Sequence, residues 1–111
     1  MIIVKGQVRF GDGEIERLKP DFAANIAATR AEPGCAAYSY SVDALDPNLL
    51  HVAEEWASEE AIDAHMQSPH IGALFAALGA SKVESTRIDA YEAHYARYTK
   101  IYPAIKEIYR R

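Results

Sequence analysis

The spacing of the apolar residues changes repeatedly along this chain, and each change predicts a new element of secondary structure. In residues 2–10 the apolar side chains occupy alternate positions, which is typical of a strand with two different faces. After the glycine-rich turn at 11–13, apolar residues recur every three or four positions from Ile15 to Ile26. This pattern predicts an amphipathic helix that begins at Glu14 and ends near the Glu32-Pro33-Gly34 segment.

The middle of the chain predicts a β-hairpin. Residues 36–42 and 49–56 both alternate in the manner of strands, and both contain aromatic or β-branched residues. Between them lies Asp46-Pro47-Asn48, three residues that favour a turn. We therefore expect two antiparallel strands joined at this point.

Two serines predict the starts of two short helices. Ser58 is a good N-cap for a helix beginning at Glu59-Glu60, and Ser68 followed by Pro69 predicts that a second helical segment starts there and ends at Gly79. His65 and His70 flank the break between the two segments.

Residues 84–96 supply a last strand and complete the order βαββαβ, which is that of the α+β ferredoxin-like fold. We expect one domain over residues 1–96. Residues 97–111 are predicted to form an extension, in which a short helix opening at Pro103 packs on the domain or on a dimer partner.

Composition excludes several classes of protein. The chain has 111 residues, enough for one core, and 12 basic against 16 acidic residues give a formal net charge of −4. The basic residues form no stripe, so nucleic acid is not an expected partner. No apolar stretch approaches the roughly 20 residues that span a membrane, and the N-terminus has no leader pattern. With Cys35 as the single cysteine, these features predict a cytoplasmic protein.

Several local strings together resemble the antibiotic-biosynthesis monooxygenase family. The resemblance covers about residues 1–93, in the order and spacing of the family, and its most specific element is the helix break with both histidines. The strings are Glu32-Pro33-Gly34-Cys35 with Tyr38, Asp46-Pro47-Asn48, Glu54-Glu55-Trp56 and His65-Met66-Gln67-Ser68-Pro69-His70.

The resemblance implies a homodimer, because members of this family typically pair their sheets face to face into a dimeric α/β barrel. Physical reasoning supports the same expectation. A sheet covered by helices on one face needs cover on the other, and we expect few charges on that face. The seven tyrosines also suit a protein interface or a partly hydrated pocket.

The resemblance also implies oxidation of a small aromatic hydroquinone or phenol by molecular oxygen without any cofactor. Such a protein must enclose the ring, accept a phenolic proton and exclude water. Histidine suits the proton acceptor because its pKa is ordinarily near neutrality. We therefore predict His65, and secondarily His70, as catalytic, with a substrate pocket formed by Trp56, Tyr38, Tyr40, Glu54 and Phe75.

Structural roles compete with each of these assignments. His65 and His70 would equally serve to bond backbone groups freed at the helix break. Trp56 suits the core, and the two strand tyrosines suit an interface as well as a pocket. An inward Glu54 must be paired or protonated, and a basic residue of a partner subunit would pair it.

Metal binding is not predicted, because the two histidines are five residues apart, whereas the familiar helical zinc ligands are four apart with a catalytic glutamate between them. Haem degradation, known in proteins of the same fold, is a minor alternative. The first strand has no asparagine, and Phe75 stands near the position expected for the iron ligand.

Two further classes of function fit the same features. An isomerase or lyase acting on a small oxygenated metabolite would use the same pocket and histidine base, because a fold does not dictate the reaction. A ligand-binding dimer without catalysis is the other alternative.

Overall fold

The computed structural model describes residues 1–93, and its elements follow the predicted order. They are β1 (Ile2–Phe10), α1 (Glu14–Arg30), β2 (Cys35–Val42), β3 (Leu49–Trp56), α2 (Glu59–Met66), α3 (Pro69–Gly79) and β4 (Val83–Glu92). This is the predicted ferredoxin-like arrangement, with its second helix divided in two. The proposed end of the last strand and the extension at 97–111 lie outside the described residues.

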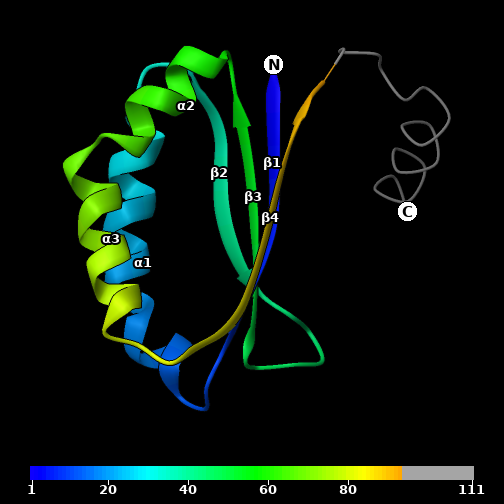
Figure 1. The fold of residues 1–111 in the computed structure, drawn as a ribbon, viewed down its shortest axis with the longest axis vertical. Coiled ribbons are helices and arrows are strands. Elements are labelled where there is room, and N and C mark those ends of the chain that lie inside the picture. The colour runs from blue at the N-terminus through cyan, green and yellow to red at the C-terminus, as the bar shows by residue number, and fades with distance from the viewer. Residues whose placement is uncertain (94–111) are drawn as a thin grey trace, which may run out of the picture.

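The four strands form one sheet in the order β2-β3-β1-β4, and all neighbouring strands are antiparallel. All three helices lie on one face of this sheet (Figure 1). The pairing aligns side chains across that face in rows. Val4 pairs with Glu54 on β3 and with Ala90 on β4, and Glu54 in turn pairs with Tyr38 on β2. One such row therefore brings a carboxylate and a phenol together under the helices.

The core lies between the helices and strands β1, β2 and β3. The largest fully buried side chains are Trp56, Phe10, Leu18 and Thr29. Strand β4 differs, since almost all of its residues are exposed and even the helix-facing Ile88 is 54% exposed. The helix layer thus leaves the β4 edge of the sheet open.

Gly34 determines how the chain passes from α1 to β2. Its φ of 86° lies in the left-handed region, which glycine adopts without strain. A Cβ at this position would also lie 2.7 Å from the Cβ of Ala61 on α2. The loop that carries Glu32 can therefore pack closely against α2.

The predicted caps separate α2 from α3. The side chain of Ser58 accepts a hydrogen bond from the Ala61 amide, and that of Ser68 accepts one from the Ile71 amide, with Pro69 in the first turn of α3. The Ser68 hydroxyl also donates to the His65 carbonyl oxygen at 2.6 Å. This serine closes the end of one helix while it starts the next.

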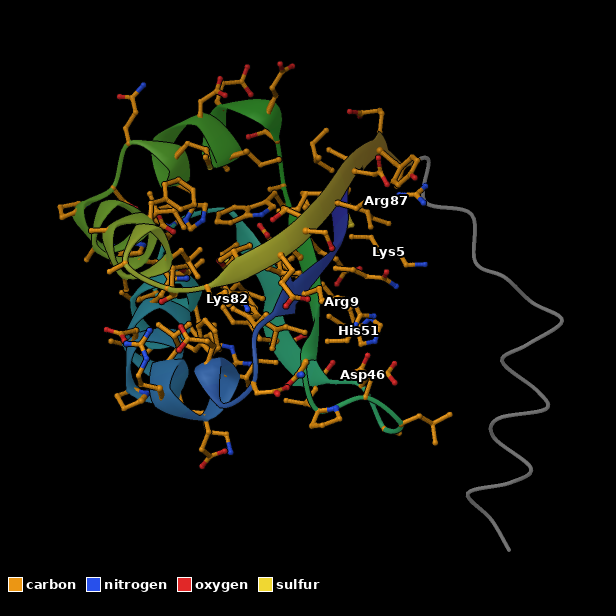
Figure 2. The ribbon with its side chains drawn as sticks, turned by 60° about the horizontal axis from the view of Figure 1, so that its bottom comes forward. Lys5, Arg9, Asp46, His51, Lys82 and Arg87 are labelled. Carbon is orange, nitrogen blue, oxygen red and sulfur yellow. The ribbon has the colours of Figure 1, made fainter. Side chains whose placement is uncertain are left out.

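The outer face of the sheet carries more charge than its sequence pattern predicted. Lys5, Arg9, His51 and Arg87 point away from the helices in Figure 2. Alternation requires this result, because the residues between the core positions of each strand must face the other side. Across residues 1–93, no helix combines the length and apolarity needed to span a bilayer.

Candidate active site

A cavity of about 280 Å³ lies between the sheet and the helices. Every described helix and strand contributes to its lining, which is apolar apart from a few converging polar side chains. A partly open apolar cavity with a few polar groups is the usual form of a small-molecule site. The polar lining residues are Tyr38, Tyr40, Glu54 and His65.

Five of the seven predicted site residues line this cavity, and two do not. Phe75 is the fifth lining residue, and it is 50% exposed at the cavity edge, as are Met66 and Ile88 to similar extents. Trp56 is fully buried and lies behind the lining, so it is a core residue rather than a pocket wall. His70 also lies outside the lining.

His65 is the buried base candidate, with only 3% of its surface exposed. Its Nδ1 lies 2.6 Å from Oε2 of Glu32. Because an ionised carboxylate can only accept, this contact selects the tautomer with the proton on Nδ1, in which Nε2 has a free lone pair. The ring packs against Trp56 with centroids 4.8 Å apart and against Tyr38 at 5.5 Å.

The Nε2 atom of His65 is reachable from the cavity. No residue among 1–93 makes a hydrogen bond to it, yet every buried side-chain nitrogen or oxygen in this part of the chain has a partner. The atom must therefore be accessible, and His65 lines the cavity. His65 thus presents a proton acceptor of defined tautomer to the apolar cavity.

His70 has a different environment from His65. Its Nε2 lies 3.2 Å from both the Glu32 carboxylate and the Ser68 hydroxyl, and its side chain is 22% exposed. The helix break brings both histidines to Glu32, but only His65 reaches the cavity. This geometry supports a base role for His65 and not for His70.

Glu54 brings a second titratable group to the cavity. Burial raises the pKa of its carboxyl, although the Trp56 indole N–H, which donates to Oε1 at 2.8 Å, and the nearby His65 act in the opposite direction. We expected a basic residue of another subunit to pair with Glu54. Trp56 of the same chain supplies this polar partner, at least in part. A glutamate with a raised pKa can hold a proton closer to neutral pH than usual.

The two strand tyrosines form one hydrogen-bonded group. Their hydroxyl oxygens are 2.6 Å apart, and the Asn25 amide donates to Tyr38 at 3.0 Å and to Tyr40 at 2.9 Å. Burial raises the pKa of both phenols, so they stay neutral at physiological pH. They therefore act as fixed neutral hydroxyls and not as proton acceptors.

Sequence reasoning missed Glu32 and Asn25 as site residues. Glu32 stands in the Glu32-Pro33-Gly34-Cys35 string, which marked the end of the first helix and formed part of the family resemblance but did not point to Glu32 as a site residue. Asn25 lies on the buried face of α1, three residues after Phe22, where a polar side chain needs a partner. That polar residue at an apolar position was the available signal.

Comparison with known protein families identifies the family of this chain. The model of the antibiotic biosynthesis monooxygenase family matches residues 1–77, and the chain belongs to that family. The resemblance noted in the sequence is thereby confirmed.

The individual proteins that this chain is similar to are less well defined in function than the family. The chain is 30% identical over 69 residues to the uncharacterized protein sll1783 of Synechocystis, covering 62% of this chain and 47% of that protein. It thus spans about half the length of this curated relative. A solved structure of a candidate antibiotic biosynthesis monooxygenase from Deinococcus radiodurans is 29% identical, with a TM-score of 0.80 over 86% of this chain and 95% of that one. A conserved protein from Methanosarcina mazei is 25% identical, with a TM-score of 0.77 over 84% of this chain and 92% of the other.

Proposed function

We propose that this protein is a cofactor-independent monooxygenase that oxidises a small aromatic hydroquinone or phenol with molecular oxygen. The observation that carries the proposal is His65, whose Nδ1 is held by Glu32 while Nε2 is accessible in an apolar cavity. Membership of the monooxygenase family supports the reaction type. The volume of about 280 Å³ suits a small aromatic molecule.

In the proposed reaction, Nε2 of His65 accepts the proton of a ring hydroxyl, and Glu32 stabilises the imidazolium that forms. The resulting anion is electron-rich and reacts with oxygen. For a hydroquinone, one oxygen atom enters the ring, the other leaves as water, and the product is a hydroxyquinone. The substrate thus supplies all the electrons.

The remaining cavity residues orient the substrate. Tyr38 and Tyr40 present neutral hydroxyls, and a protonated Glu54 can donate a hydrogen bond to a substrate oxygen. Phe75 contributes an aromatic surface at the edge. These side chains would keep the ring in place while water is excluded.

We also propose that the protein works as a homodimer, in which a second copy covers the outer face of the sheet. The support is the helix-free face itself, whose alternate residues include both charges and small side chains. A reducing cytoplasm remains the predicted location, in keeping with a single cysteine.

Oxygen uptake with a panel of small hydroquinones tests the activity. We expect uptake that depends on the protein, equals product formed and persists in EDTA. Exchange of a substrate proton without oxygen uptake would favour the isomerase alternative. Saturable binding of the panel without any turnover would favour the ligand-binding alternative, and either result would overturn the proposal.

A further inference from the structure

Three side chains that could bind a metal ion converge beside the cavity. Glu32 comes from the loop after α1, His65 from the last turn of α2, and His70 from the first turn of α3. One ligand atom of each lies within 4.8 Å of the others. The spacing of the two histidines along the chain disfavoured a metal site, because it differs from the spacing of zinc ligands on one helix. That spacing takes no account of a carboxylate brought in from a distant loop.

We propose that Glu32, His65 and His70 bind a divalent transition-metal ion, with Zn²⁺ as the probe. Two imidazole nitrogens and one carboxylate oxygen form a donor set that suits zinc, and water would complete the tetrahedron. Magnesium and calcium prefer oxygen ligands alone, so they should bind poorly.

The two distances from Glu32 fit this assignment after a small adjustment, and the third, between the histidine nitrogens, is at most 4.8 Å. Tetrahedral zinc with bonds of about 2.1 Å separates its ligand atoms by roughly 3.4 Å. Oε2 of Glu32 lies 3.2 Å from His70 Nε2, close to that value, and 2.6 Å from His65 Nδ1. The second pair therefore needs to open by less than about 1 Å, a shift within the reach of side-chain torsions.

The burial of the three residues is also suited to a metal site. The His65 side chain is 3% exposed and packs against Trp56 and Tyr38, whereas those of Glu32 and His70 are 16% and 22% exposed. An ion can thus enter from the surface and meet one fixed ligand. Neither Glu32 nor His70 lines the cavity, so the ion would lie behind His65, away from the substrate.

Metal binding here should inhibit the proposed reaction. An ion on Nδ1 of neutral His65 forces the ring proton onto Nε2, and Nε2 then has no lone pair with which to accept a substrate proton. This consequence depends on the proposed function. The binding of the ion does not.

Titration of the full chain with Zn²⁺ against a chromogenic chelator tests the binding. We expect one ion per chain, unaffected by excess Mg²⁺, with affinity reduced by about a hundredfold or more in Glu32→Gln and in His70→Ala. His51→Ala is the matched control, because His51 pairs with Asp43 at 2.8 Å on the outer face and has no third ligand among residues 1–93. Circular dichroism establishes that each variant is folded.

The outcomes separate the metal site from the activity. Absence of saturable binding, or unchanged affinity in folded Glu32→Gln and His70→Ala, would overturn the site. Equal loss of affinity in His51→Ala would overturn it too. Binding together with inhibition at the same zinc concentration supports the whole proposal. Binding with undiminished turnover supports the site and contradicts the base role of His65.

Discussion

At the scale of single residues, the reaction depends on one nitrogen atom of His65. Replacing His65 with Gln removes the proton acceptor but keeps a polar side chain that can donate to Glu32. We expect turnover per folded molecule to fall about a hundredfold or more, the usual contribution of a positioned general base. Steady-state oxygen uptake, corrected by the folded fraction from a thermal melt, measures this change.

His70→Gln is the comparison, since His70 shares the Glu32 carboxylate but does not line the cavity. We expect it to retain much more turnover than His65→Gln. If His65→Gln lost about 1 to 3 kcal/mol of stability but kept near-normal turnover, its role would be to satisfy polar groups, and the base assignment would be wrong.

We expect the buried Glu54 carboxyl to make the free energy of unfolding depend on pH. Burial raises its pKa in the folded chain above the ordinary value of 4.5, so the folded state holds this proton more tightly than the unfolded state. The resulting stability is present below the unfolded pKa and is lost as pH rises through the folded pKa. Glu54→Gln should therefore melt at a higher temperature than the unchanged protein at about pH 8, and the difference should shrink near about pH 4. A difference that grows toward low pH would contradict this.

The chemical character of the site residues was predictable from sequence, but their connections were not. Within the family resemblance, His65 was predicted from its place at the helix break, Glu54 from its inward carboxylate, and the two tyrosines as aromatic walls of a pocket. Glu32 was missed because its partner is 33 residues away in the chain. Trp56 was misplaced because alternation gives the face of a strand and not the depth of a side chain beneath that face.

At the scale of elements, the two serine caps have different expected effects. Ser68→Ala removes the cap of α3 and the donor to the His65 carbonyl, whereas Ser58→Ala removes only the cap of α2. Each should cost about 1 kcal/mol of stability. Only Ser68→Ala should also lower turnover, because it releases the backbone that holds the base. Denaturant titration and oxygen uptake measure both quantities, and equal turnover in the two variants would contradict the expectation.

The elements themselves followed closely from local signals. β3 was expected at 49–56 and is found at Leu49–Trp56, because a proline turn and a serine cap delimit it. The start of α3 was fixed by Ser68-Pro69 in the same way. The exposure of β4 was not predictable, because it depends on which strands the helices cover, and no local pattern contains that information.

At the scale of the whole molecule, the helix-free face of the sheet leads us to expect that two copies of the chain form a dimer. We expect light scattering at micromolar concentration to give twice 12.3 kDa. Ala53→Arg places a bulky charge on the exposed outer side of β3 and should weaken the dimer, whereas Ala24→Arg, on the exposed side of α1, should not. A stable monomer of the unchanged protein, or equal behaviour of the two variants, would contradict the proposed interface.

The turn at Gly34 has a consequence for how this sequence can vary. A residue without a side chain, outside the cavity lining, sets how closely the loop bearing Glu32 approaches Ala61 on the helix that bears His65. In a library randomised at position 34, selection for activity should recover almost only glycine. Selection for folding alone should also admit asparagine, which tolerates the left-handed conformation. Selection on the chemistry would then also constrain a position that makes no chemical contribution.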